Sequence, residues 1–328
     1  MAARRRRGKK KKPLKRWLSL GLLALLVAFS GLITAGEHYG WPLPRWSEIE
    51  TALGINDAPT VATDSPTTIY FIDVGQANAT LIRQGEEYAL IDAGEIGEGD
   101  RLVEYLKAAG VTRLRCVVMT HPHSDHIGGM PEVLAAFPVD EFLLPDFSLL
   151  DQTPSSDILA KTLAALETQK QNGCKVETAA RGMKIPIGEG ELRVLLAGIE
   201  TDNANNLSVC TKFVAGSFSC LFTGDGEKKV EEELLAVEPD LRADVFLAAH
   251  HGSRTSNSEE FLAAVRPGTV VISCGMDNSY GHPHAEVVDR FEALGAAVYR
   301  TDQQGSIQLT VDTDGAVTVT CAREGEVS

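Results

Sequence analysis

Four residues of the types that bind metal ions lie within a six-residue stretch of this chain. The segment THPHSDHIGGM, residues 120–130, contains His121, His123, Asp125 and His126. Imidazole nitrogens and carboxylate oxygens suit Zn²⁺, Mn²⁺ or Fe²⁺. One ion cannot easily take four ligands from six consecutive residues, but two ions about 3.5–4 Å apart can share them. We therefore expect His121 and His123 to face one ion, and Asp125 and His126 to face a second.

Most of the remaining histidines lie close to the ends of predicted strands. Apart from His38, they form two further clusters, at residues 250–251 and 282–284, and each follows a predicted strand directly or after a short loop. Asp73, Asp92 and Asp225 occupy similar places. Because binding residues are carried on loops that a rigid scaffold brings together, segments distant in sequence can meet at one rim of a sheet.

The elements that would position these residues alternate between strands and helices. Expected strands cover residues 67–74, 79–84, 88–94, 114–120, 192–198, 207–214, 218–225, 243–253, 269–275, 297–301, 306–311 and 316–321. Expected helices cover residues 100–110, 128–137, 155–173, with Ser155 as a plausible N-cap, 227–237, 258–265 and 285–295. Such a mixed α and β pattern needs sheets whose outer faces are covered by helices.

Charge divides the chain into two parts. The net charge of the 328 residues is −14, yet the first 16 residues hold ten lysines or arginines and no acid. The rest carries 21 basic and 45 acidic residues, a net charge of −24. Such a body repels polyanions at long range, which excludes non-specific binding of bulk nucleic acid.

The segment after this basic head predicts a membrane anchor. Residues 17–35 form an uncharged run of 19 residues, about enough for one helix to cross a bilayer. The positive flank should stay in the cytoplasm, which places the rest of the chain outside the cell membrane. A cleaved signal peptide, giving a secreted protein, is the alternative. Residues 36–66 are rich in Pro, Thr, Asp and Ala and indicate a stalk, followed by a hydrolase domain over residues 67–324.

HPHSDH matches the HxHxDH signature of the metallo-β-lactamase superfamily. Further segments resemble the hydrolase domain of the DNA-uptake competence protein ComEC and its stand-alone relatives: FIDVGQANATLI, LIDAG, NNLSV, LFTGD, LAAHHGS, NSYGHPH and YRTDQQGSI. The resemblance runs from about residue 67 to residue 322. It implies an α+β fold, the four-layer αββα sandwich, with a dinuclear metal site at the rim.

The resemblance also implies roles for residues outside the HxHxDH segment. Asp225 is similar to the carboxylate that bridges the two ions, and His250 to the remaining ligand of the second ion. His251 and Ser253 would lie beside it, placed to contact a substrate phosphate or to support the ligand. His282 would line the pocket as a proton donor or phosphate contact.

Two departures from the superfamily pattern affect the first ion and the pocket. Many members supply a third histidine to the first ion, but the corresponding region, TDNANNLSV, contains none, so Asn205, Asn206 or water would fill the place. Asn206 is also expected to bind substrate. Weaker binding by oxygen ligands makes Mn²⁺ credible beside Zn²⁺. The ComEC-like branch usually shows VGQGD, where this chain has VGQAN; Gln76 is retained and is expected to face the pocket.

These residues predict metal-assisted hydrolysis. Divalent ions lower the pKa of a water between them and neutralise charge on the attacked group, while Asp125 and Asp225 orient that water. The resemblance favours a phosphodiester: nucleic acid, a nucleotide or an envelope phosphodiester. Hydrolysis of a β-lactam or another ester or amide is an alternative, and a non-catalytic, membrane-tethered binding protein is another. The basic residues that could form a local path for an anion are Lys212, Lys228, Lys229, Arg254 and Arg300.

Overall fold

The computed structural model describes residues 29–33, 66–152 and 154–323. The expected basic head, most of the expected membrane span and almost all of the expected stalk lie outside these residues. Residues 29–33 are helical. Within the described ranges, no helix combines the length and the apolar character that crossing a bilayer requires. Contacts between Cα atoms separate residues 1–56 from residues 57–328, and the folded body belongs to the second unit.

The first sheet has eight strands in the order β15-β14-β1-β2-β3-β4-β5-β6. Pairing is antiparallel from β15 to β3 and parallel from β3 to β6. The strands are β1 (Thr67–Phe71), β2 (Thr80–Gln84), β3 (Glu87–Ile91), β4 (Leu114–Val118), β5 (Val139–Leu144), β6 (Lys175–Thr178), β14 (Ile307–Val311) and β15 (Val317–Cys321).

The second sheet has seven strands in the order β13-β12-β11-β10-β9-β8-β7. Here β10 to β13 are parallel, and β7 to β10 are antiparallel. The strands are β7 (Lys184–Ile187), β8 (Gly190–Ala197), β9 (Val209–Ala215), β10 (Phe218–Phe222), β11 (Val245–Leu247), β12 (Thr269–Ile272) and β13 (Ala297–Arg300).

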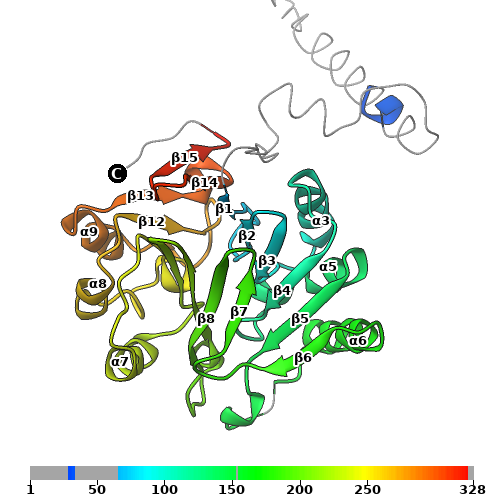
Figure 1. Ribbon diagram of the computed structural model, residues 1–328, viewed down its shortest axis with the longest axis horizontal. Helices are drawn as coiled ribbons and strands as arrows, with labels where there is room; N and C mark the ends of the chain where they lie inside the picture. The colour runs from blue at the N-terminus through cyan, green and yellow to red at the C-terminus, as the bar shows by residue number, and fades with distance from the viewer. Residues whose placement is uncertain (1–28, 34–65, 153, 324–328) are drawn as a thin grey trace, which may run out of the picture. The chain divides into compact units, whose positions relative to one another are not determined.

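Helices cover the outer face of each sheet, so the body has four layers in the order αββα (Figure 1). One outer layer is α3 (Gly99–Ala108), α5 (Met130–Ala136) and α6 (Asp157–Gln171), and the other is α7 (Lys228–Val237), α8 (Glu259–Val265) and α9 (Ala285–Ala293). Shorter helical turns are α4 (Ser124–Ile127), α10 (Thr301–Gln304), η1 (Phe147–Leu149), η2 (Ala204–Leu207) and η3 (Ala249–Gly252). The α+β sandwich expected from the sequence is confirmed for the described body.

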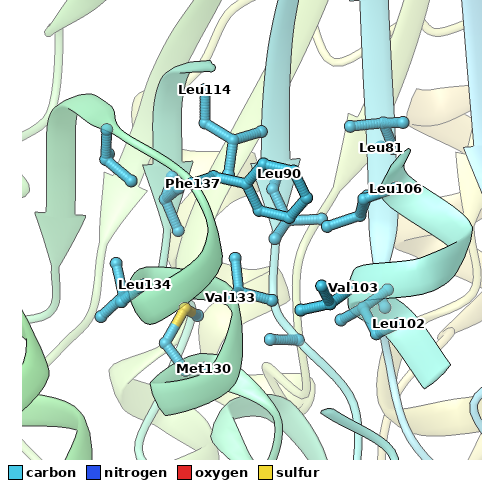
Figure 2. Close-up of a cluster of buried hydrophobic side chains, with 14 of the residues drawn as sticks. Leu81, Leu90, Leu102, Val103, Leu106, Leu114, Met130, Val133, Leu134 and Phe137 are labelled. Atoms are coloured by element: carbon cyan, nitrogen blue, oxygen red, sulfur yellow. The ribbon is translucent and has the colours of Figure 1, made fainter. Parts of the chain in front are cut away.

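Alternation along the strands builds the three apolar interfaces between these layers. In β1, Ile69 and Phe71 point between the two sheets, while Tyr70 points towards the first helical layer. Figure 2 shows the interface under α3 and α5, where Leu81 and Leu90 of the sheet lie close to helix side chains. A third apolar cluster fills the space between the second sheet and α7, α8 and α9. Five of the six cysteines are buried in or beside these interfaces, and all six are unpaired.

The sequence analysis missed some elements. Strands β5, β6 and β7 were not predicted. The hydroxyl that caps α6 belongs to Ser156, which accepts a hydrogen bond from the Leu159 amide at 3.2 Å, rather than to Ser155. The parallel strands matter most for function, because their carboxyl ends lie at the same edge of each sheet. The loops after β3 and β4 and the loops after β10, β11 and β12 therefore carry the candidate site residues to one rim.

Candidate metal centre

The HxHxDH segment is a tight turn that begins at His121, three residues after the end of β4 at Val118. His123 is the N-terminal flanking residue of α4, and Asp125 and His126 lie in that short helix. The turn then passes close to the end of β3, where the amides of Gly128 and Gly129 donate to the carbonyls of Gly94 and Ala93 at 2.8 and 3.0 Å. A Cβ atom on Gly129 would lie 2.6 Å from the Ala93 oxygen. The Gly-Gly pair is thus required for close approach of two backbones.

Four ligand-type side chains meet at the centre of the rim. One ligand atom from each of Asp125, His126, Asp225 and His251 lies within 4.8 Å of the others. They come from three separate loops: the turn after β4, the turn after β10 and the turn after β11. His126, Asp225 and His251 are buried. The fold therefore concentrates two carboxylates and two imidazoles that lie between positions 125 and 251 of the sequence.

Three atoms of this cluster are buried polar atoms without a hydrogen-bond partner. They are Nε2 of His126, Nε2 of His251 and Oδ1 of Asp225. Nε2 of His126 and Oδ1 of Asp225 lie 3.2 Å apart, yet neither makes a hydrogen bond. Leaving such groups unpaired costs about 1–3 kcal/mol each. A divalent cation would satisfy all three, so the residues present fit a metal ion.

The orientation of His126 is fixed by Asp92, a residue that the sequence analysis placed at a strand end without giving it a role. Nδ1 of His126 lies 2.6 Å from Oδ2 of Asp92. Asp92 also accepts hydrogen bonds from the amide and hydroxyl of Thr120, at 2.9 and 2.7 Å. Since a carboxylate can only accept, Nδ1 of His126 carries the proton and Nε2 is turned towards the cluster. An acid directly after a strand, one helix and one strand before the metal motif, is the signal that could have identified it.

Hydrogen bonding and burial distinguish the two adjacent histidines of the turn after β11, His250 and His251. Nδ1 of His251 donates to the Ser273 carbonyl at 2.8 Å, and its Nε2 lies 3.4 Å from Oδ2 of Asp125. The side chain of His250 is more exposed, at 20% against 2% for His251, although Nε2 of each lies 3.7 Å from Oδ2 of Asp225. The sequence analysis gave the ligand role to His250 and placed His251 beside it. The structure places His251 in the four-residue cluster, and the ligand role of His250 stays a prediction.

A backbone turn in an unusual conformation presents these two histidines. His250 and His251 both have left-handed backbone angles, with φ of 51° and 53°. Such residues cost free energy and persist only where surrounding contacts hold them. The buried Asn257 supplies those contacts, because its side chain accepts from the Ala249 amide at 3.0 Å and donates to the carbonyls of Ala249 and Ser253 at 3.0 and 3.1 Å.

Asn257 is held in turn by a buried acid of α7. Glu231 accepts hydrogen bonds from the backbone amides of Asn257 and Ser258. Burial raises the pKa of Glu231 above its ordinary value, against the effect of these hydrogen bonds. Sequence reasoning missed both Asn257 and Glu231, since neither lies in a ligand-type motif.

His121 and His123 lie on the other side of the cluster. Nε2 of His121 is 3.0 Å from Nδ1 of His123 and 4.0 Å from Oδ2 of Asp225. Two imidazole nitrogens this close, with a carboxylate beside them, could hold a first ion that shares Asp225 with the second. The expected division of the HxHxDH residues between two ions is compatible with this arrangement, and the ligand assignments stay a prediction.

The two asparagines of the TDNANNLSV region have different surroundings. Asn205 lines the pocket beside the cluster, and its Oδ1 is buried without a hydrogen-bond partner. Asn206 is turned away from the pocket, and its Oδ1 accepts from the Glu227 amide at 3.1 Å. Of the two, Asn205 is therefore the one placed to offer an oxygen ligand, and Asn206, which was predicted to bind substrate, supports the backbone after Asp225.

Burial and mutual charge set the protonation of the cluster. Burial disfavours the charged form of every member of the cluster. The imidazoles and the carboxylates nevertheless stabilise each other's charged forms. The pKa of Asp225 is held well below its ordinary value by His126 and His251, and that of Asp125 is lowered by the nearby His126 and His251. The carboxylates of Asp225 and Asp92 raise the pKa of His126 well above 6.5. Burial, by contrast, lowers the pKa of His121 well below 6.5.

A pocket of about 340 Å³ opens over these residues. Its lining contains Gln76, His123, Ser124, Asp125, Asn205, Asp225, His250, His251, Tyr280 and His282. No lysine or arginine lines it. Of the residues expected to form a basic path, Lys212, Lys228, Arg254 and Arg300 instead form ion pairs elsewhere on the described body.

Gln76 fixes the tautomer of His282 at the wall of this pocket. The Gly275 amide donates to Oε1 of Gln76 at 2.9 Å, which leaves Nε2 of Gln76 to donate to Nδ1 of His282 at 3.2 Å. The proton of the neutral imidazole is therefore on Nε2 of His282. Burial, with the neighbouring His250 and His251, lowers the pKa of His282 to about 4, so the ring is neutral at pH 7.

Ser253 does not line the pocket. Its hydroxyl lies 3.1 Å from the hydroxyl of Thr255 and accepts from the Thr255 amide at 3.3 Å, within the turn that follows the two histidines. The predicted contact between Ser253 and a substrate phosphate is therefore not supported by the position of this side chain, which stabilises the turn.

Comparison with known proteins agrees with this geometry. The family model of the metallo-β-lactamase superfamily matches residues 72–276. The chain belongs to this superfamily. The match includes every residue of the central cluster and ends just before the segment that carries Tyr280 and His282.

Similar curated proteins are ComEC-like competence proteins. The chain is 32% identical to ComE operon protein 3 of Bacillus subtilis over 208 residues, which are 63% of this chain and 26% of that protein. It is 29% identical to competence protein ComA of Neisseria gonorrhoeae over 300 residues, 90% of this chain and 39% of that protein. The chain thus spans well under half the length of these relatives.

Among solved structures, CmlA, a diiron β-hydroxylase from Streptomyces venezuelae, has a similar fold. The TM-score is 0.50 at 15% identity, and the match covers 76% of this chain and 55% of that one. At this level of identity the likeness concerns the fold alone.

Proposed function

We propose that this metallo-β-lactamase-fold protein is a metal-dependent phosphodiesterase. The observation that carries the proposal is the convergence of three unpaired buried atoms, on His126, His251 and Asp225, beside an open pocket. A protein that had kept the fold only for binding or assembly would have no reason to keep this costly arrangement. The kinship with competence proteins favours a phosphodiester as substrate.

The pocket could bind an anionic substrate only when metal ions are bound. Two carboxylates and no lysine or arginine line it, so a phosphodiester would be repelled by the protein alone. Bound divalent ions would neutralise that charge and make a water nucleophilic at neutral pH. The residues that would hold them are His121, His123 and Asn205 on one side and Asp125, His126 and His251 on the other, with Asp225 between.

The protonation states of Asp125, Asp225 and His282 indicate different roles for them in the reaction. Asp125 and Asp225 are ionised at neutral pH and can orient the attacking water and accept its proton. His282 is neutral, with its proton on Nε2, and would donate a hydrogen bond to a phosphoryl oxygen from the wall of the pocket. Gln76 would keep His282 in that tautomer.

The test uses purified protein loaded with Zn²⁺ or Mn²⁺ and bis-p-nitrophenyl phosphate, with a chromogenic cephalosporin assayed in parallel. Asp125→Ala and Asp225→Ala should each lower the rate by orders of magnitude, because they remove the groups that position the water. His284→Ala is the control, since its Nδ1 accepts from the Arg254 amide at 3.1 Å outside the pocket lining. Wild-type rates in both aspartate variants would disprove the metallohydrolase, and cleavage of the cephalosporin alone would change the substrate class.

We also propose that residues 17–35 anchor the protein in the cell membrane with the hydrolase domain outside the cytoplasm. This rests on the charge of residues 1–16 and the apolar run that follows. Protease added to intact cells should cleave within residues 36–66. Full protection of this segment would disprove the orientation, and a mature chain beginning near Ala35 would show a secreted protein instead.

A further inference from the structure

Tyr280 is an exposed aromatic residue at the mouth of the candidate metal centre. It lies in the segment between β12 and α9, lines the pocket, and is 67% exposed. Its ring stacks on His282, with ring centroids 5.6 Å apart and an angle of 23° between the planes. His282 in turn stacks on His251 of the central cluster, at 6.3 Å and 23°. Three nearly parallel rings thus lead from the cluster to solvent.

The exposure of Tyr280 does not arise from a loose loop. The side chain of Asn278 ties the segment together, since its amide donates to the carbonyls of Gly275 and His282 at 2.9 and 2.6 Å. Its oxygen accepts from the backbone amides of Tyr280 and His282 at 3.2 and 3.0 Å. The partly buried Asn278 therefore holds the backbone of both Tyr280 and His282, so the Tyr280 ring is exposed on an ordered segment.

An aromatic face held in this way is suited to a planar ring. His282 covers one side of the Tyr280 ring, and the large exposed fraction shows that much of the ring is free to make a further contact. Aromatic side chains stack on nucleobases of any sequence, because every base has a π-face. A polyol phosphate, such as an envelope polymer, has no planar group that could use this surface.

We infer that Tyr280, stacked on His282, forms a subsite for a nucleobase beside the scissile phosphate. The inference rests on the proposed phosphodiesterase function and narrows its substrate class to esters that carry a base. The division of tasks follows from the pocket lining: the metal cluster meets the phosphate, and the aromatic stack meets the base. The pocket volume of about 340 Å³ lies in the range of small-molecule sites and suits one nucleotide better than a duplex.

The test compares two phosphodiesters with the same charge and the same leaving group, p-nitrophenyl thymidine 5′-phosphate and methyl p-nitrophenyl phosphate. Wild-type protein should prefer the nucleoside ester in kcat/KM by about 5- to 150-fold, the range that stacking of one base provides. Tyr280→Ala and Tyr280→Leu should lose most of this preference, and Tyr280→Phe and Tyr280→Trp should keep it. Met276→Ala is the matched control, because Met276 is 65% exposed in the same segment but does not line the pocket.

A binding measurement separates this inference from the proposed function. The fluorescence of a 2-aminopurine nucleotide falls when its base stacks, so titration of the metal-loaded full chain should quench it in wild type and much less in Tyr280→Ala. If both esters are cleaved and Tyr280→Ala keeps the wild-type preference, the subsite is disproved while the function stands. If neither ester is cleaved, the function is disproved, and equal quenching in wild type and Tyr280→Ala would disprove the subsite as well. Loss of the preference in Tyr280→Phe would show that the hydroxyl, and not the ring, makes the contact.

Discussion

At the scale of single residues, the candidate centre depends on which nitrogen of each histidine is free. Nδ1 of His126 is bonded to Asp92, and Nδ1 of His251 is bonded to the Ser273 carbonyl. Both rings therefore turn Nε2 towards Asp225. Partners outside the ligand set commonly contribute about 10- to 100-fold to metal affinity by fixing ligand tautomers in this way.

Asp92→Asn should weaken metal binding by about 10- to 100-fold. The oxygen of the new amide must face the Thr120 amide, which donates to this side chain, so its NH₂ would face His126 and move the imidazole proton to Nε2. The backbone should tolerate the change, because Asp92 has a φ of 60° and asparagine accepts this conformation. Chelator competition measures the affinity.

Asp73→Asn is the matched control for Asp92→Asn. Asp73 also follows a strand, but it pairs with Arg323 and accepts no bond from a histidine of the cluster. Its variant should bind metal as wild type does. Equal metal affinity in Asp92→Asn and wild type would mean that Asp92 does not set the tautomer of His126.

Metal binding should release protons at pH 7. In the metal-free protein the neighbouring carboxylates raise the pKa of His126 and of His251 above 6.5, despite burial, so Nε2 of each tends to carry a proton that an ion must displace. Protons compete below these pKa values, so metal affinity should rise as the pH increases through them and level off above. Calorimetric titration in buffers of different ionisation enthalpy counts the protons; release of none at pH 7 would contradict the raised pKa values.

At the scale of elements, the site depends on close approach between the turn after β4 and the turn after β3. A Cβ atom on Gly128 would overlap the backbone at Glu95 and Ile96, and would lie 2.6 Å from the Ser124 carbonyl. Backbone atoms cannot move aside as a flexible side chain can. Gly128 and Gly129 therefore let α4 pack close enough to the end of β3 for His126 to contact Asp92.

Gly128→Ala should lower the free energy of unfolding by about 1–3 kcal/mol or more, because the added methyl group forces two backbones apart. Metal affinity should fall with it, since α4 carries Asp125 and His126. Gly268→Ala is the control: its Cβ would meet only the Asp244 carbonyl oxygen, at 3.7 Å. Urea unfolding of both variants provides the measurement, and similar stabilities of the two would show that the turn has room to adjust.

At the scale of the whole molecule, charge opposes long nucleic acid substrates. Residues 57–328 carry 20 basic and 42 acidic residues, a net charge of −22. The negative charge of the body repels a short substrate with one negative charge only weakly, while it repels an oligonucleotide strongly. Screening reduces the repulsion, since the Debye length falls from about 30 Å at 0.01 M salt to about 8 Å at 0.15 M.

Raising the salt concentration should therefore increase kcat/KM for a single-stranded oligonucleotide relative to that for p-nitrophenyl thymidine 5′-phosphate. The assay uses residues 57–328, which form their own compact unit, so that the basic residues of the head do not contribute. The small ester, assayed at each salt concentration, controls for effects of salt on the chemistry. A relative rate for the oligonucleotide that falls with salt would reveal a basic path to the site.

The sequence by itself predicted twelve of the fifteen strands of the described body, the six helices that cover the sheets and the presence of a metal motif. Strands such as β1 alternate apolar residues of opposite faces, and HxHxDH concentrates ligand types in one turn, so these features are local and can be predicted. Asp225, also identified from the sequence, lies in the central cluster.

Only the tertiary structure decided which of two adjacent residues of the same type faces the site. His250 and His251 follow the same strand, and two consecutive left-handed residues, held by Asn257, turn His251 inward. Asn205 faces the pocket and Asn206 does not, because a 3₁₀ turn separates their directions. Asp92 meets His126 across 34 residues of chain. Such choices depend on contacts between loops from different strands, which no local pattern in the sequence records.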